Sequence, residues 1–93
     1  MTRRSVVQWL VRYFTPRAQE ASAGPVTEKT RPIRHLGYDS VDGLDFACDI
    51  GDALGVDLPL DVNPLLNAAG TRDLRVDEIT DLILSHGQDE EGE

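Results

Sequence analysis

Cysteines are scarce in this sequence and long apolar runs are missing. Within its 93 residues the uninterrupted hydrophobic stretches are only a few residues long, whereas a transmembrane helix needs about 20. Cys48 is the single cysteine, which excludes an internal disulfide and a multi-cysteine zinc site. A chain this short holds one small core rather than a deep catalytic cleft. We therefore expect a single domain over residues 1–87 that is cytoplasmic, monomeric and not inserted into a membrane.

Basic residues are missing from the middle of the chain. Residues 1–34 carry a net charge of +5 and residues 35–93 a net charge of -13. Between His35 and Thr71 there are seven Asp and no Lys or Arg. Such a surface repels nucleic acids and anionic membranes and attracts proteins with basic patches. The alternative interpretation is a face that only keeps the protein in solution.

No run of alternating apolar and polar residues is long enough for a β-strand. The spacing of the apolar residues predicts helices instead. Apolar residues at three- and four-residue steps predict a first helix over 5–14. Ser5 and Gln8 have the spacing of a capping box at its start, and Pro16 is expected to end it. Residues 15–35 then form a long first loop, which Val26, Ile33 and Leu36 are expected to anchor to the helices.

The second half of the chain predicts three further helices. The first begins at a cap on Asp39 or Ser40 and ends at Gly55. A short helix is expected over 63–69 and a last helix over 76–85. The acidic tail 88–93 lacks apolar anchors and is expected to be disordered. The predicted fold is therefore an all-α bundle of three main helices plus one short helix.

The helix that follows Ser40 has three distinct faces. At 3.6 residues per turn its core face consists of Phe46, Ala47, Ile50, Ala53 and Leu54. An acidic stripe is formed by Asp42, Asp45, Asp49 and Asp52. Beyond the stripe lie the apolar side chains of Val41, Leu44 and Cys48. An apolar patch beside an acidic stripe indicates a protein docking site, although these side chains could instead pack under the long loop.

Ser40 lacks the partners of a catalytic nucleophile. Such a serine needs a base within reach and a third group to orient that base. The only histidines are His35 and His86, and the residues around Ser40 do not form a G-x-S-x-G elbow. The aspartates do not have the spacing of a calcium loop, and Cys48 has no neighbouring base or cation. We therefore expect a protein that is not an enzyme and binds no metal.

A distinctive motif runs from Leu36 to Pro59. It consists of Leu36-Gly37-Tyr38-Asp39-Ser40-Val41-Asp42, then Asp45, Phe46, Ile50, Leu54-Gly55-Val56 and Leu58-Pro59. This motif resembles the acyl carrier protein family. The resemblance covers residues 26–59, and the last helix with Val76 and Glu78-Ile79 also fits. The resemblance implies an acyl-carrier-like bundle in which Ser40 carries covalent 4'-phosphopantetheine.

The same resemblance implies partners and a role for the acidic residues. A phosphopantetheinyl transferase would modify Ser40, and Asp39 with the acidic stripe would meet the basic surfaces of acyl-transferring, ligating or condensing enzymes. The carrier would present acyl thioesters to them in fatty acid, polyketide or specialised lipid synthesis. A phosphodiester on Ser40 would also benefit from the positive end of the helix dipole.

Several residues depart from the family pattern. Val41 replaces the usual leucine, Gly43 and Gly51 lie within the helix, and residues 18–24 lengthen the first loop. Residues 63–70 also differ from the usual third-helix region. These departures suggest a specialised carrier with its own partners. The alternative hypothesis is an acidic helical interaction module that binds a basic protein while Ser40 stays unmodified.

Overall fold

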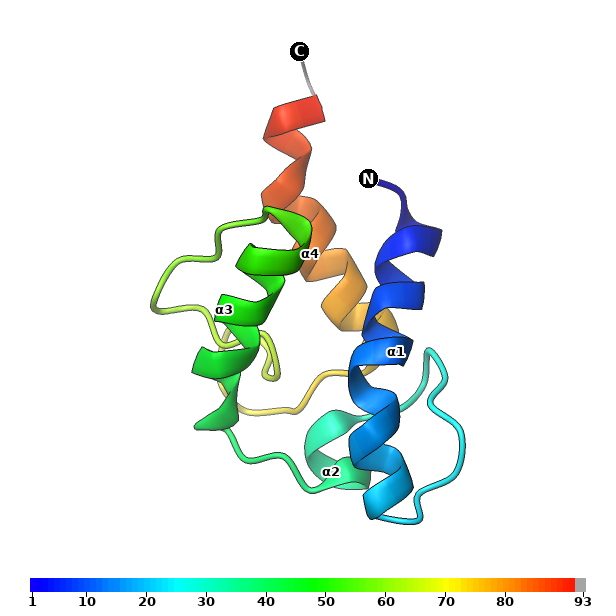
Figure 1. Ribbon diagram of the computed structural model, residues 1–93. Helices are drawn as coiled ribbons and strands as arrows, with labels where there is room; N and C mark the ends of the chain where they lie inside the picture. Colours follow the sequence, from blue (N-terminus) through cyan, green and yellow to red (C-terminus); the bar gives the residue numbers. More distant parts are fainter. Residues whose placement is uncertain (92–93) are drawn as a thin grey trace.

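Four helices occur, in chain order, among the residues that the structure describes. The computed structural model describes residues 1–91, with side chains described through residue 87. The helices are α1 (Arg3–Glu20), α2 (Pro32–Leu36), α3 (Asp42–Leu54) and α4 (Val76–Glu91) (Figure 1). Among the described residues the β-structure amounts to one isolated bridge between Leu66 and Asp73. The predicted all-α bundle of three main helices and one short helix is confirmed.

α1 is longer than the sequence predicted at both ends. Its cap is Thr2, whose side chain accepts from the Ser5 N–H while the Ser5 hydroxyl accepts from the Thr2 N–H, both at 3.1 Å. The predicted capping box of Ser5 and Gln8 was therefore wrong, because the box is formed one turn earlier by Thr2 and Ser5. The helix also continues through Pro16 to Glu20. Burial of Ala18 in the core accounts for this continuation, because tertiary contacts can offset the helix bond that proline removes.

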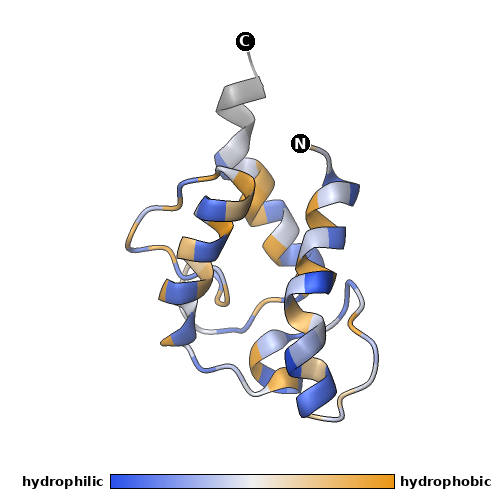
Figure 2. Cartoon of the chain, viewed as in Figure 1, coloured by the Kyte–Doolittle hydropathy of each residue, from blue (hydrophilic) through white to orange (hydrophobic). Residues whose placement is uncertain are grey.

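α1 and α4 pack side by side and supply most of the core (Figure 1). α1 buries one residue per turn and α4 about two, and Figure 2 shows hydrophilic and hydrophobic residues alternating around both helices. The buried residues are Val6, Leu10, Phe14 and Ala18 on α1 and Val76, Ile79, Thr80 and Ile83 on α4. The Thr80 hydroxyl donates to the Val76 carbonyl at 2.9 Å, so the buried polar group is satisfied.

The connection between α1 and α2 is tied to the start of α4. The Thr30 carbonyl accepts from the Val76 N–H and the Glu28 carbonyl from the Asp77 N–H, both at 2.9 Å. These bonds satisfy N–H groups that a helix start leaves without intrahelical partners. Val26, Ile33 and Leu36 pack on the core as expected. The predicted loop over 15–35 is nevertheless shorter, since α1 occupies its first residues and α2 its last.

The short helix lies at residues 32–36 and not at residues 63–69. Pro32 at the first helical position favours α2, and Gly37 ends it in the left-handed region with φ 80°. Over 63–69 the chain instead turns, because the Asn67 side chain bonds nearby backbone and Gly70 has φ 70°. Backbone bonds from Asn67 to Arg72 and from Leu74 to Leu65 complete a small hairpin.

α4 runs past its predicted end at Ser85. Gly87 does not stop the helix, since it is buried and its φ is not positive. A Cβ at that position would come within 2.8 Å of the Met1 side chain, so close packing explains the glycine. The backbone stays helical to Glu91, so the helix is six residues longer than predicted, while the predicted disorder of the tail stays a prediction. Residues 92–93 of the predicted tail lie outside the described residues.

No helix within residues 1–91 is long and apolar enough to cross a membrane.

The continuation of α1 through Pro16 generates a test of the fold. Pro16→Ala restores a helical N–H donor at an exposed site, so we expect the free energy of unfolding to rise by about 1–2 kcal/mol. Urea denaturation measures this change. Pro25→Ala, in the connection after α1, is the matched control and should give no gain. A loss of stability in Pro16→Ala would contradict a helix that passes through this residue.

Candidate functional site

Ser40 lies exposed in a turn immediately before α3. The turn is closed by backbone bonds from the Asp42 N–H to the Asp39 carbonyl (3.0 Å) and from the Gly43 N–H to the Ser40 carbonyl (3.1 Å). Val41, in the α-helical region, is the cap residue, and no side chain caps the helix. The predicted cap on Asp39 or Ser40 was therefore wrong. The carboxylate of Asp42 instead accepts from the Asp39 N–H at 2.8 Å.

The residues before Ser40 are held by the last turns of α1. Arg17 donates to the Gly37 carbonyl at 3.1 Å, and its guanidinium lies 4.2 Å from the centre of the Tyr38 ring. Tyr38 in turn meets Phe14 edge to face, with ring centres 5.5 Å apart. Burial is the main cause that raises the Tyr38 pKa, and Arg17 opposes it. Arg17 can make these contacts because α1 continues past Pro16, where the sequence predicted that the helix would end.

The residues after Ser40 are held by the irregular segment 55–75. Asn63 donates to the Ser40 carbonyl at 2.7 Å, and Gly43 is buried against the Asn63 side chain. The glycine at position 43, inside α3, therefore has a packing reason. The Ser40 turn is thus fixed on both sides while the serine itself remains exposed.

The core face of α3 is largely as predicted. Phe46 and Ile50 are buried, and Ala47 and Leu54 are half-buried. Ala53 was assigned to the core and is exposed. It lies at the edge of the predicted face on the helical wheel.

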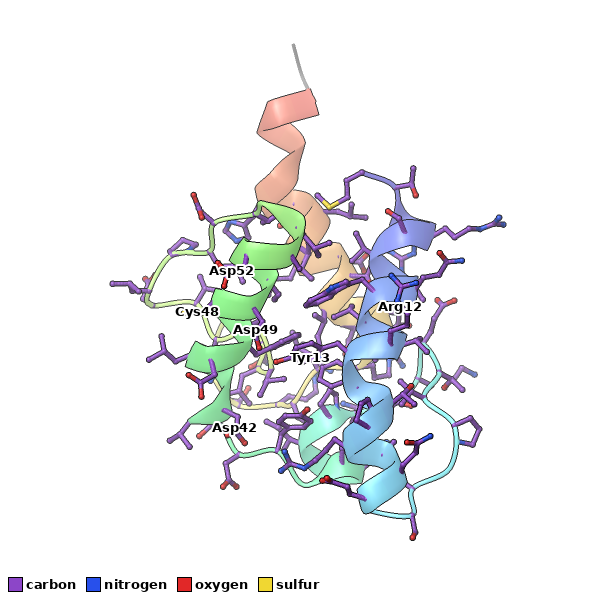
Figure 3. The ribbon with its side chains drawn as sticks, viewed as in Figure 1. Arg12, Tyr13, Asp42, Cys48, Asp49 and Asp52 are labelled. Atoms are coloured by element: carbon purple, nitrogen blue, oxygen red, sulfur yellow. The ribbon has the colours of Figure 1, made fainter. Side chains whose placement is uncertain are left out.

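The acidic stripe divides into two kinds of carboxylate. Asp45 and Asp52 are exposed, whereas Asp42 and Asp49 are half-buried and engaged. Asp49 accepts a hydrogen bond of 2.5 Å from the Tyr13 hydroxyl of α1, and Figure 3 shows the two side chains directed toward one another across the gap between the helices. Burial and this bond raise the Tyr13 pKa above its ordinary value. A partner can therefore reach Asp45 and Asp52 more readily than Asp49.

The predicted apolar patch is exposed and does not pack under a loop. Val41 is 78% exposed, Leu44 60% and Cys48 is also exposed. Leu60, which the sequence analysis missed, is 93% exposed at a turn closed by a bond from the Val62 N–H to the Pro59 carbonyl. The sequence feature that could have predicted the exposure of Leu60 is the position of an apolar residue between Pro59 and Asp61, in a turn.

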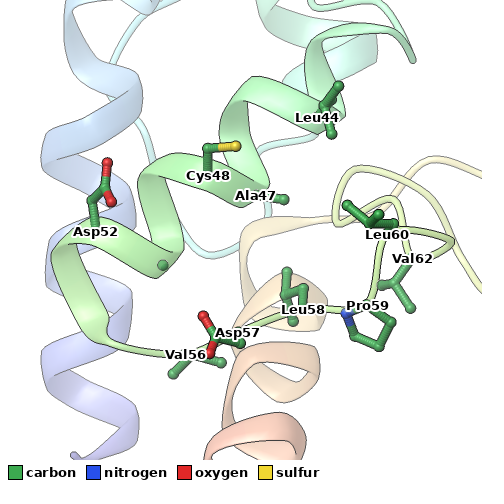
Figure 4. A pocket seen from close by; sticks show the side chains of 11 residues that line it. Leu44, Ala47, Cys48, Asp52, Val56, Asp57, Leu58, Pro59, Leu60 and Val62 are labelled. Atoms are coloured by element: carbon green, nitrogen blue, oxygen red, sulfur yellow. The ribbon is translucent and has the colours of Figure 1, made fainter.

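A groove joins Leu60 to the α3 patch. Its volume is about 290 Å³, and it lies between α3 and residues 56–62 (Figure 4). Leu44, Cys48 and Gly51 line one wall, and Leu58 and Leu60 line the other. Asp52 and Asp57 stand at its rim. The site is therefore a groove lined mainly by apolar residues and bordered by acids, beside the helix that follows the Ser40 turn.

Within the described residues the surroundings of Ser40 supply no catalytic base. The Nδ1 atom of His35 accepts from the Arg31 N–H at 2.9 Å, at the start of α2. His86 lies on α4 beside a different cavity. Among residues 1–87, whose side chains the structure describes, the Ser40 hydroxyl makes no hydrogen bond, and no group of three or more metal-ligating side chains occurs.

Comparison with models of known protein families, with curated proteins and with solved structures finds no significant match.

The bond from Tyr13 to Asp49 predicts a pH-dependent stability. The pKa of Tyr13 is higher in the folded protein than the unfolded tyrosine value of 10.0. The folded state is therefore stabilised while the tyrosine keeps its proton, and this stabilisation is lost as the pH rises from 10 through the folded pKa. Tyr13→Phe should lower the free energy of unfolding by about 1 kcal/mol at neutral pH and weaken its decline above pH 10.

Urea midpoints between neutral pH and about pH 11 measure both effects. Tyr38→Phe is the control, because its hydroxyl makes no bond to Asp49. Equal neutral-pH losses in the two variants would contradict a specific contribution from the Tyr13–Asp49 bond.

Proposed function

We propose that this protein is an acyl carrier protein that carries acyl groups as thioesters on 4'-phosphopantetheine attached to Ser40. The observation that carries the proposal is the setting of Ser40. Its side chain is exposed, its turn is fixed by Arg17 contacts on one side and Asn63 on the other, and accessible Val41 and Leu44 follow it. These are the properties required of a serine that a second protein must reach and modify.

The residues around Ser40 fit a phosphodiester. The modification joins Ser40 Oγ to the phosphorus that bears pantetheine in coenzyme A. The anhydride bond to the nucleotide half breaks, that half departs, and the hydroxyl proton passes to the transferase. The positive end of the α3 dipole favours the resulting anion. Asp42 is turned toward the Asp39 N–H, which limits its repulsion of the new charge.

The prosthetic arm supplies the terminal thiol that forms the thioester, and the protein supplies recognition. Asp45 and Asp52 are the exposed acids of α3 that would steer basic partner surfaces. Leu44 and Leu60 would close the contact, because burial of large exposed apolar side chains favours association. The partners are a phosphopantetheinyl transferase and acyl-transferring, ligating or condensing enzymes. We place this carrier in the cytoplasm as a monomer.

The segment 55–75 supports a specialised carrier. It forms a hairpin and a groove in place of a helix, and Leu60 projects from it. Partners that dock on α3 would also contact this segment. Its shape therefore favours dedicated partner enzymes over those of housekeeping fatty acid synthesis.

An interaction module without modification is the second candidate, and the groove beside Leu60 favours it. This apolar groove with acids at its rim can receive a basic protein whatever the state of Ser40. Binding by such a module is sensitive to salt and survives Ser40→Ala. A carrier would lose its function in that variant.

Modification of Ser40 is the direct test of the carrier. Incubation with a broad-specificity phosphopantetheinyl transferase and coenzyme A should add the mass of one phosphopantetheine to the intact protein. Ser40→Ala should gain nothing, whereas Ser85→Ala, an exposed serine on α4, should behave as the wild type. Intact mass spectrometry measures the gain. An unmodified wild type, or a gain by Ser40→Ala, would overturn the proposal.

The exposed acids predict how fast the transferase acts. Asp45→Asn with Asp52→Asn should lower kcat/KM for Ser40 modification about threefold to tenfold at low ionic strength, with less effect in high salt. Steady-state kinetics at two salt concentrations measure this. The matched control is the exposed acid at the end of α1, Glu20→Gln, which should change kcat/KM little. An equal effect in the control would point to net charge and not to the α3 surface.

A further inference from the structure

Asn63 connects the irregular segment 55–75 to the turn that contains Ser40. Its side-chain Nδ2 donates to the Ser40 carbonyl at 2.7 Å, and its Oδ1 accepts from the Leu65 N–H at 2.9 Å. The Ser40 carbonyl thus accepts two hydrogen bonds, since the Gly43 N–H also reaches it. The side-chain amide of Asn63 therefore uses both its N–H donor and its oxygen acceptor. The donor bonds the Ser40 turn, and the acceptor bonds the segment of Asn63 itself.

Gly43 makes this contact sterically possible. A Cβ at residue 43 would overlap the Oδ1 of Asn63 and lie 2.7 Å from its Nδ2. Because Gly43 has an ordinary helical φ, the glycine serves the approach of Asn63 and not a left-handed turn. Asn63 can therefore take this position only because residue 43 has no side chain.

We propose that Asn63 is a positioning residue for the modification of Ser40, an inference that rests on the proposed function. The bond to the Ser40 carbonyl fixes the peptide plane between Ser40 and Val41. The serine Cα and Cβ are therefore held in one orientation while the hydroxyl stays exposed. A nucleophile held in its reactive orientation loses less entropy when it reacts. Asn63 acts on the hydroxyl through the backbone and does not touch the transferred group.

The chemistry of this position requires an amide. An aspartate could still accept from the Leu65 N–H, but it has no N–H to donate and would place negative charge against the Ser40 carbonyl. An alanine removes both bonds. Asn63→Asp therefore removes the contact with Ser40 while keeping the local turn, and Asn63→Ala removes both.

The test is the steady-state kinetics of Ser40 modification by a broad-specificity phosphopantetheinyl transferase with coenzyme A. Asn63→Ala and Asn63→Asp should lower kcat about fivefold to tenfold. KM for the carrier should change little, since the docking residues on α3 are untouched. Gly43→Ala displaces the Asn63 side chain and should have the same effect. The double variant Gly43→Ala with Asn63→Ala should be no slower than the slower single variant, because both changes break one contact.

Asn67→Ala is the matched control for loss of stability. Asn67 lies in the same segment and bonds Thr71 and Arg72, away from the Ser40 turn. It should lower the urea midpoint of unfolding without changing kcat. If Asn63→Ala does not fold, Asn63→Asp, which keeps the Leu65 bond, decides the result.

The outcomes separate the two proposals. If the wild type is modified but the Asn63 variants keep a kcat within about twofold of it, the positioning role is overturned and the carrier function stands. The same holds if Asn67→Ala slows modification as much as the Asn63 variants do. If the wild type itself is not modified on Ser40, the proposed function fails and the positioning role fails with it.

Discussion

One aromatic cluster holds α1 against α3 and against the residues that precede Ser40. It contains all five aromatic side chains of the chain, with ring centres 5.0–5.5 Å apart: Trp9, Tyr13, Phe14, Tyr38 and Phe46. Backbone packing between α1 and α3 is sparse, so these rings fill the space between them. Large aromatic side chains bury much apolar surface and add favourable edge and stacking contacts. The position of α3, and with it the Ser40 turn, depends on this cluster.

Polar contacts at the edge of the cluster convert this packing into a defined site. Tyr13 bonds Asp49 on α3, and Arg17 covers Tyr38 while bonding Gly37. Asn63 completes the arrangement from the opposite side. These contacts leave the serine, two acids and several apolar side chains of α3 exposed. A small bundle can in this way be rigid around a residue whose side chain it leaves exposed, as the proposed carrier function requires.

Sequence periodicity predicted the faces of α3 well and the ends of the helices less well. Phe46 and Ile50 are buried and Leu44 and Cys48 exposed because a helix places residues by their spacing alone. Pro16 was expected to end the first helix and the last helix was expected to end at Ser85, yet Pro16 and Gly87 both lie inside helices. Proline and glycine inside a helix cost only about 1–3 kcal/mol each, and burial of neighbouring side chains outweighs this cost. The predicted helix over 63–69 failed for a similar reason, since the Asn67 side chain bonds the backbone in place of helical bonds.

The sequence by itself determined the all-helical class, the acidic surface of residues 35–71 and the serine before an amphipathic helix, because composition and spacing are properties of the chain alone. Only the tertiary structure decided which acids are free, since Asp49 is engaged by a tyrosine 36 residues away. It also decided that Leu60 joins the exposed patch and that Asn63 holds the Ser40 carbonyl across 23 residues. Contacts between distant segments depend on how the helices pack, and no local pattern in the sequence records them.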